Sequence, residues 1–381
     1  MRQPTLRAIL ALAFGLFSYA QSHPTRAASQ ATAQAFQLQL SSPYHPVRTV
    51  PLPFLKHLRG EFLFEPVSRR LFVPDGKNLI EINPDAGKMV GVVKKIGRVS
   101  AIAFAPDLHE GFAVNSDRGG IEVFDLETLA ILQKIHAGGG ASLAFYNPAT
   151  KEVVTASGYA KNCRVFDPLA RKSIKTVKLG GYPLGGVADA EGHLYFELSR
   201  DALPYPLHRR LGIPVLEELP PSATEIAKLD GRRLTMTKLW NEPCRSIHLL
   251  AVESKRQRLI ADCGGSVASI NTKTGNLVTT TAIAGDPLFC LHLDETSGEL
   301  FALSPRLPAL IVLHEDSAGR FDKPAIVVRG LNLNVAFDDK RGQIFILKSD
   351  KKLSRTIFGD QVISGFEPVP GTFRIEVYGK N

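Results

Sequence analysis

Long apolar segments are nearly absent from this 381-residue sequence, and so are the short motifs that mark many catalytic centres. After the first twenty residues, no segment approaches the roughly eighteen consecutive apolar residues that a membrane-spanning helix needs. The sequence has no Cys-x-x-Cys-His for covalent haem, no His-Glu-x-x-His for zinc, no Gly-x-Ser-x-Gly nucleophile elbow and no phosphate-binding loop. These absences exclude the enzyme classes that those motifs define, and they predict a mature chain without a transmembrane segment.

Cysteine is also scarce, with four residues at positions 163, 244, 263 and 290. An even number permits disulfides in an oxidising compartment, with three connectivities, but a chain of this length folds without such cross-links. The sequence is therefore compatible both with disulfide pairing of these cysteines and with buried free thiols. By contrast, 32 glycines and 25 prolines interrupt apolar runs that rarely exceed five residues, which favours short strands with many turns.

The N-terminus has the pattern of a secretory signal peptide. Arg2 and Arg7 precede the apolar residues 8–17, and Ser18-Tyr19-Ala20 forms a small-x-small cleavage site. A retained anchor or a buried helix is the alternative for the apolar run, and Ala27-Ala28 is an alternative cleavage site. Residues 21–40 are poor in bulky side chains and are expected to form a flexible lead-in. We therefore expect a periplasmic or secreted protein with residues 1–20 removed.

The formal net charge is +9, and it falls to +7 when Arg2 and Arg7 leave with the signal peptide. Such an excess favours anionic partners, including nucleic acid, lipid head groups and acidic glycans. The basic residues are scattered in short clusters, which is also typical of a solvated surface. DNA binding is therefore kept as an alternative function, although the sequence has no dedicated basic segment for it.

A repeat of about forty residues is the main feature of the sequence. Each unit has an apolar strand ending in a Pro, Asp or Asn turn, a second strand, a glycine-bearing turn, a third alternating strand and a fourth. Intervals of 40, 41, 43, 64, 41 and 44 residues separate the equivalent positions, which are Phe64, Phe104, Phe145, Ala188, Val252, Leu293 and Phe337.

Four short strands cannot bury both faces of their own sheet, whereas sheets packed radially around an axis can. The seven units therefore predict an all-β, seven-bladed β-propeller over residues 41–381, with residues 47–52 closing the ring as a strand of the last blade. A repetitive sandwich or solenoid is the alternative. The long fourth interval predicts an insertion at about residues 199–225.

Segments 103–107 (AFAPD), 112–115 (FAVN), 121–125 (IEVFD) and 179–183 (LGGYP) resemble the YVTN-repeat, YncE-like exported propellers. The resemblance covers about residues 54–359 and is densest in the first units. It implies a bacterial periplasmic or secreted propeller, and it implies no particular ligand, because members of this family have been linked to DNA binding or surface attachment while many have no known role.

Candidate binding residues follow from propeller geometry, because the entrances to the innermost strands surround the central channel. Arginine beside the axis suits a carboxylate or phosphate, and basic and aromatic residues of the insertion can hold an anionic partner. The ligand-binding candidates are Arg98, Tyr182, Arg245, His248, Asn332 and Asn334 at the channel, with Tyr205, His208, Arg209 and Arg210 in the insertion. Hydrogen bonding to strand ends is their alternative role.

A metal-dependent, lactonase-like hydrolase is the alternative function. Glu61 and His248 near the channel, with Asn332 and Asn334, are the residue types that hold a divalent cation and polarise water. Cys290 and His292 share one face of a strand and are weaker metal candidates; core packing is their alternative role. We predict no cofactor and assign no catalytic residue. The expected function is that of a monomeric, non-catalytic binding protein for a protein, glycan or anionic ligand.

Overall fold

A computed structural model describes the part of the chain that forms the propeller. The described residues belong to one compact unit, Gln39–Asn381. They are 42–56, 62–115, 119–136, 140–200, 224–241, 250–263, 265–283, 288, 290–304, 309–322, 324–329, 334–358 and 361–380. Among them no helix has the length and apolarity that crossing a bilayer requires.

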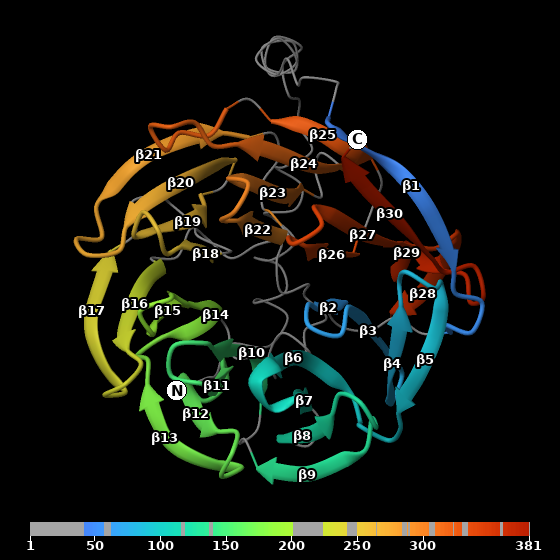
Figure 1. Ribbon diagram of the computed structural model, residues 1–381, viewed down its shortest axis with the longest axis horizontal. Coiled ribbons are helices and arrows are strands. Elements are labelled where there is room, and N and C mark those ends of the chain that lie inside the picture. The colour runs from blue at the N-terminus through green and yellow to red at the C-terminus, as the bar shows by residue number, and fades with distance from the viewer. Residues whose placement is uncertain are drawn as a thin grey trace, which may run out of the picture. The chain divides into compact units, whose positions relative to one another are not determined.

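Seven four-stranded antiparallel sheets are arranged as blades around an axis (Figure 1). Blade 1 contains β2 (Leu63–Glu65), β3 (Arg70–Asp75), β4 (Asn78–Asn83) and β5 (Lys88–Val93). Blade 2 contains β6 (Val99–Ala105), the 3-10 turn Pro106–Leu108, β7 (Glu110–Asn115), β8 (Gly120–Asp125) and β9 (Ile131–His136). Blade 3 contains β10 (Ala141–Asn147), β11 (Glu152–Ser157), β12 (Asn162–Asp167) and β13 (Lys172–Lys178).

The next three blades repeat this order from the innermost to the outermost strand. Blade 4 contains β14 (Tyr182–Ala188), β15 (His193–Ser199), β16 (Thr224–Asp230) and β17 (Thr235–Asn241). Blade 5 contains β18 (Leu250–Glu253), β19 (Arg258–Asp262), β20 (Ser266–Asn271) and β21 (Leu277–Ala282). Blade 6 contains β22 (Cys290–Asp294), β23 (Glu299–Ser304), β24 (Ala309–His314) and β25 (Ala325–Arg329).

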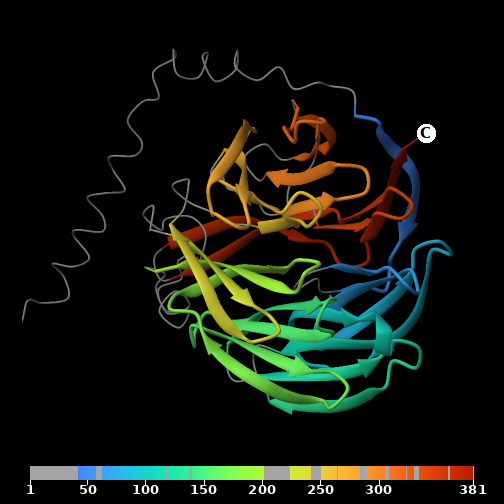
Figure 2. The ribbon, with the colours of Figure 1, turned by 60° about the vertical axis from the view of Figure 1, so that its left-hand side comes forward.

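Blade 7 combines the two ends of the propeller sequence. It contains β26 (Asn334–Asp338), β27 (Gln343–Lys348), β30 (Arg374–Lys380) and, outermost, the N-terminal strand β1 (Tyr44–Pro51). Strand β1 runs antiparallel to β30, with Tyr44 opposite Lys380 and Pro51 opposite Arg374, and both views show them side by side (Figures 1 and 2). The predicted seven-bladed propeller, with its ring closed by an N-terminal strand, is confirmed.

A two-stranded sheet, β28 (Lys351–Phe358) and β29 (Gln361–Pro368), interrupts blade 7 between its second and third strands. The sequence analysis does not predict this hairpin. It lengthens the last unit, which explains why the repeat is weak there. The predicted insertion of the fourth unit falls between β15 and β16, and residues 201–223 lie outside the described residues.

Burial follows the radial position of each strand. Strand β7, second from the axis, is buried along its whole length because neighbouring sheets cover both of its faces. Strand β13, outermost in its blade, exposes all but one of its residues. This gradient explains why second strands have continuous apolar sequences while outer strands carry lysines and threonines.

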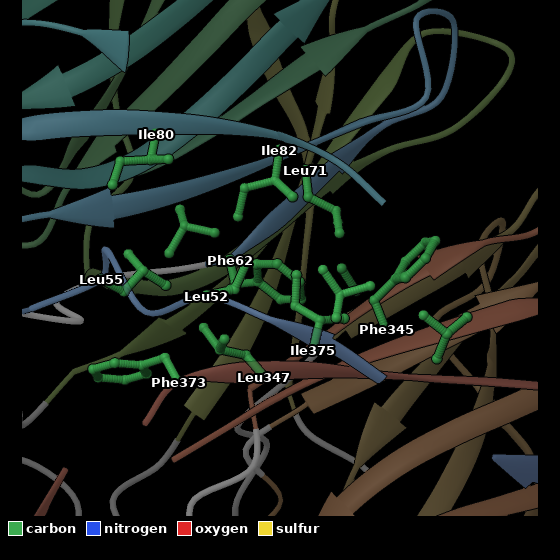
Figure 3. Packing of buried hydrophobic residues seen from close by; sticks show 14 residues of the cluster. Leu52, Leu55, Phe62, Leu71, Ile80, Ile82, Phe345, Leu347, Phe373 and Ile375 are labelled. Atoms are coloured by element: carbon green, nitrogen blue, oxygen red, sulfur yellow. The ribbon is translucent and has the colours of Figure 1, made fainter. Parts of the chain in front are cut away.

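Side chains from neighbouring sheets hold the ring together, as the boundary of blades 7 and 1 shows (Figure 3). Leu71 and Ile82 of blade 1 share one cluster with Phe345 and Ile375 of blade 7, and Leu52 follows β1 into it. All five are 0% exposed. Burying a side chain of this size contributes about 1.5–3 kcal/mol, so each such boundary stabilises the closed ring.

Strand direction gives the ring two chemically different ends. At the entrance end, the chain enters each innermost strand and the second strand turns into the third. At the turn end, the first strand meets the second and the third meets the fourth. In blade 1, for example, the entrance end holds the β3–β4 turn and the β5–β6 connection, joined by a hydrogen bond from Gly97 N to Lys77 O of 3.3 Å.

Candidate functional site

Three of the predicted channel residues are described, and all three lie at the entrance end. Arg98 directly precedes β6 and is exposed, while Tyr182 and Asn334 are the first residues of β14 and β26 and are half-buried. Their places in the repeat are equivalent, since each stands where the chain enters an innermost strand. The prediction that these residues surround the channel mouth agrees with the strand order, while their binding role stays a prediction.

Tyr182 has a cationic neighbour that the sequence analysis did not single out. The ammonium of Lys161, in the β11–β12 turn, lies 4.3 Å from the centroid of the Tyr182 ring. The backbone of Leu179 donates to Lys161 O over 2.9 Å, which fixes that turn against the β13–β14 connection. A cation held against an aromatic face is worth about 0.5–1 kcal/mol at an exposed site, and it leaves the remaining ammonium hydrogens for an anion.

Basic residues gather at the entrance end of blades 1 to 3. The backbone of Lys95 donates to the side chain of Asn78 over 3.2 Å, and this contact joins the β5–β6 connection to the β3–β4 turn, which carries Lys77. Lys178 ends β13 opposite Asn162, next to Lys161. We call this set the basic rim; its members are Lys77, Lys94, Lys95, Arg98, Lys161 and Lys178.

Few carboxylates balance the basic rim. Asp75, which is half-buried, is the acidic residue among those described at the entrance end of blades 1 to 3. The five lysines of the rim form no ion pair with any described carboxylate. All of them except Lys161 are exposed. Among the described residues, the positive charges of these five lysines are therefore not paired with a carboxylate.

The turn end shows the opposite arrangement, with arginine and carboxylate side chains paired in networks. Arg258 is 4% exposed and donates to Glu253 over 2.8 Å, to Glu315, and to the backbone oxygen of Gly319 over 2.6 Å. Arg256 also contacts both glutamates, at 3.2 Å from Glu253. This network joins blades 5 and 6, and its charges are satisfied internally.

A second network joins the two sides of the ring closure. Asp85 accepts from Arg48 of β1 over 3.1 Å, from Arg69 of blade 1 over 3.2 Å and from Arg341 of blade 7 over 3.3 Å. The hydrogen bond from Arg69 is the main reason why the pKa of Asp85 is lowered from its ordinary value. Arg69 also pairs with the buried carboxylate of Asp338. These charges stabilise the ring.

Asp189, Glu191 and His193 form a cluster with the composition of a metal site, at the β14–β15 turn. However, the oxygens of Asp189 already accept from the backbone of His193 over 2.8 Å and from the hydroxyl of Tyr195 over 2.9 Å, and His193 Nδ1 lies 2.9 Å away. The Lys228 ammonium, 5.3 Å from the Tyr195 ring centroid, already supplies a positive charge. The cluster therefore acts as a turn-stabilising network.

The predicted pair Cys290 and His292 lies on β22, beside blade 7. His292 Nε2 is 2.8 Å from Asp339 Oδ1, and its ring stacks on Phe337 with centroids 4.2 Å apart. Cys290 packs against the apolar cluster between blades 6 and 7. The imidazole is thus positioned by a carboxylate and an aromatic ring. A metal role for the pair stays a prediction.

The remaining predicted residues lie outside the described part of the chain. They are Glu61, Tyr205, His208, Arg209, Arg210, Arg245, His248 and Asn332. The sequence shows the basic residues only as short scattered clusters, and nothing in it combines Lys77, Lys94 and Lys95 with Lys161 and Lys178. The signal that unites these residues is their position in the repeat, at the end of a second or fourth strand or in the connection that follows it.

Comparison with known proteins supports the fold alone. No protein-family model matches the chain, and no curated protein matches it in sequence. Among solved structures, one titled Kuenenia stuttgartiensis Hydrazine Synthase has a TM-score of 0.62 at 13% identity, covering 77% of this chain and 92% of that one. A chain of the Crystal Structure of Mitotic Checkpoint Complex has a TM-score of 0.64 at 12% identity, with 91% and 98% covered. The class defined by fold is thus the β-propellers, whose architecture is consistent with a binding scaffold.

Proposed function

We propose that this protein is an exported, non-catalytic β-propeller that binds an anionic partner at the entrance end of its channel. The observation that carries the proposal is the basic rim, where five lysines without carboxylate partners among the described residues lie beside Arg98 and Tyr182. Clustered charge of one sign raises the local concentration of an oppositely charged ligand and speeds its association.

The arrangement of the rim suits an extended polyanion better than a single small anion. Its two halves are formed by different segments, Lys77 with Lys94 and Lys95 on one side and Lys161 with Lys178 on the other. Lysines act as separate point charges with flexible stems, so they bind successive charges of a polymer without demanding one geometry. An acidic glycan and a nucleic acid both fit this chemistry.

Export is supported by the sequence of the first twenty residues and by one cysteine. Cys263 is disulfide-bonded, and disulfides persist chiefly in oxidising compartments. The Cys163 thiol is buried, which raises its pKa to about 12 and keeps it unreactive. Expression of the full chain in a Gram-negative bacterium, followed by fractionation and N-terminal sequencing, tests this part. A cytoplasmic, uncleaved protein contradicts it.

Binding is tested with the mature protein on immobilised heparin, eluted with a salt gradient. The variant K77E/K94E/K95E reverses three charges of the rim and is expected to elute at clearly lower salt than the natural protein. The matched control K172E/R232E/K273E reverses three exposed charges at the turn end, so it has the same net charge as the rim variant. Equal elution of both variants contradicts a localised site.

A nucleic acid is distinguished from a glycan by repeating the measurement with duplex DNA. Each lost phosphate contact lowers the slope of log affinity against log salt by about 0.9. If DNA is the partner, the rim variant loses about two to three units of this slope and the control loses none. A heparin effect without a DNA effect favours the acidic glycan.

A further inference from the structure

A cavity of about 370 Å³ lies between blades 1 and 2 at the turn end, where the proposed anion site has no residues. Its walls come from the β2–β3 turn, from strands β4 and β5, and from the turns β6–β7 and β8–β9. A volume of this size accommodates a small organic molecule or one long side chain.

Two buried glutamates face this cavity. Glu65 is 1% exposed and Glu81 is 3% exposed. The Glu65 carboxylate is held in its turn, because it accepts from the backbone of Val67 over 2.9 Å and from the backbone of Ser68 over 2.6 Å. Glu65 therefore supplies fixed negative charge rather than an open coordination position.

Glu81 is compensated less completely. Its Oε1 lies 3.4 Å from Arg70 Nε, and Arg70 is the cation that acts on its pKa among the described residues. Arg70 is shared, since its Nη1 also donates to the backbone oxygen of Ser68 over 2.9 Å. Two buried carboxylates and one shared guanidinium thus line the cavity, and a buried charge without enough partners is costly.

The titration of Glu81 agrees with this geometry. Burial is the main cause that raises its pKa from the ordinary value of 4.5, the Arg70 charge lowers it, and the Glu65 charge raises it again. A cation placed beside Glu81 would offset the two effects that disfavour its ionised form.

Apolar side chains complete the cavity. Leu126, which is 7% exposed, lines it together with Val67 and Val90, which are about half exposed. An occupant that fits both parts carries a positive charge on an aliphatic stem. A divalent metal fits poorly, because it needs about six oxygen ligands and gains nothing from the apolar wall.

We propose that the cavity between blades 1 and 2 binds an aliphatic ammonium group, with Glu81 accepting its hydrogen bond and the stem packing on Val90 and Leu126. The occupant is a small alkylamine. This site is separate from the basic rim, with opposite charge and at the opposite end of the ring. Its failure therefore leaves the anion-binding proposal unaffected.

The test uses n-pentylamine as the probe, titrated into the mature protein at pH 7 by calorimetry. Pentan-1-ol, of similar length without the charge, is the matched ligand and is expected to bind at least tenfold more weakly. E81Q is expected to weaken pentylamine binding by about tenfold or more, since a hydrogen bond between charged groups is lost. E122Q changes a glutamate that is also 3% exposed but faces Lys134 instead of the cavity, and it should leave binding unchanged.

E81Q is expected to fold. A carboxyl group whose pKa is raised on folding contributes stability below its ordinary pKa and loses it as the pH rises through the raised value. At pH 7 the neutral glutamine avoids that loss, so the Tm of E81Q should equal or exceed that of the natural protein.

The variant V90K gives an independent check, because residue 90 lies on β5 at the cavity edge and a lysine there brings its own ammonium. V90K should abolish pentylamine binding. It should also raise the Tm when Glu81 is present, whereas V90K/E81Q should show no such increase over E81Q. Equal binding of the amine and the alcohol, or unchanged amine binding by both E81Q and V90K, overturns the proposal.

Discussion

The turn end of the ring and the entrance end of blades 1 to 3 differ in how their charges are arranged. At the turn end, arginines and carboxylates are paired across blades, as Arg258 with Glu253 and Glu315, or Asp85 with its three arginines. At the entrance end of blades 1 to 3, the lysines of the basic rim have no such partners among the described residues. The difference indicates that these paired charges stabilise the ring, whereas the lysines of the basic rim do not take part in such pairing.

This comparison has a physical basis in the repeat. The turn end is made of short hairpin turns, whose side chains are fixed by backbone hydrogen bonds such as those from residues 127 and 128 to Asp125. Fixed acceptors hold an arginine in one position at small entropic cost. The entrance end also contains the connections between blades, and Lys94 and Lys95 in the β5–β6 connection are exposed.

The largest loss of stability is expected when Arg258, which is buried in the network of blades 5 and 6, is replaced. R258M removes the guanidinium and leaves Glu253 and Glu315 buried without it, so the free energy of unfolding should fall by about 3–5 kcal/mol. R256M, at a position whose side chain is 41% exposed, should cost about 1 kcal/mol or less. Urea unfolding of both variants measures the difference, and equal costs would falsify the assignment of Arg258 as the centre of the network.

A smaller effect is expected at Asp85, and it depends on pH. Because the pKa of Asp85 is lowered on folding, its charge contributes stability above its ordinary value of 3.8 and loses it as the pH falls through the folded value. D85N should therefore destabilise the protein at pH 7 and have little effect near pH 2. Urea unfolding at both pH values tests this, and an equal difference at both contradicts it.

The contact of Lys161 with Tyr182 is expected to contribute less to the free energy of unfolding than Asp85 does. A double-mutant cycle with K161M and Y182L should give a coupling energy of about 0.5–1 kcal/mol. The same two variants should also weaken heparin binding, since both residues belong to the entrance end. A coupling energy near zero would mean that the ring and the ammonium are neighbours without an energetic link.

The smallest effect on stability is expected for the basic rim. K77E/K94E/K95E should change the free energy of unfolding by no more than about 0.5 kcal/mol, because these exposed lysines stabilise nothing in the described part of the chain. Thermal unfolding and heparin elution of this variant measure its effect on stability and its effect on binding, respectively. A large loss of stability would show that the two ends do not differ in the way described.

The sequence predicts the blades well because burial imposes a regular pattern. Second strands such as β7 are buried along their whole length and have an apolar centre, and turn residues recur at fixed offsets, so seven units and the closing strand are recognisable. The hairpin β28–β29 escapes this reasoning, since it lies outside the repeat. Arg98, Tyr182 and Asn334 lie where the chain enters innermost strands, and their role in binding stays a prediction.

The charged sites are harder to predict from sequence. Lys77 and Lys95 are 18 residues apart, and only the β3–β4 and β5–β6 connections bring them together. The proposed ammonium site depends on Glu81 having fewer partners than Glu65. That difference comes from side-chain packing, because the two residues are of the same type. Pairing, burial and cavity shape arise from tertiary contacts that the spacing of residues does not contain.

The closure of the ring by β1 has a consequence for how the chain is made. Strand β1 leaves the ribosome before the seven blades, and its partner β30 is completed last, so the pairing of Tyr44 with Lys380 waits for the whole propeller. In that interval β1 is an unpaired strand that can join a wrong sheet. Pro46 and Pro51 lack the backbone donor that such pairing uses, and Arg48 adds charge to the same strand. The strand that closes the ring is thus also protected against aggregation during synthesis.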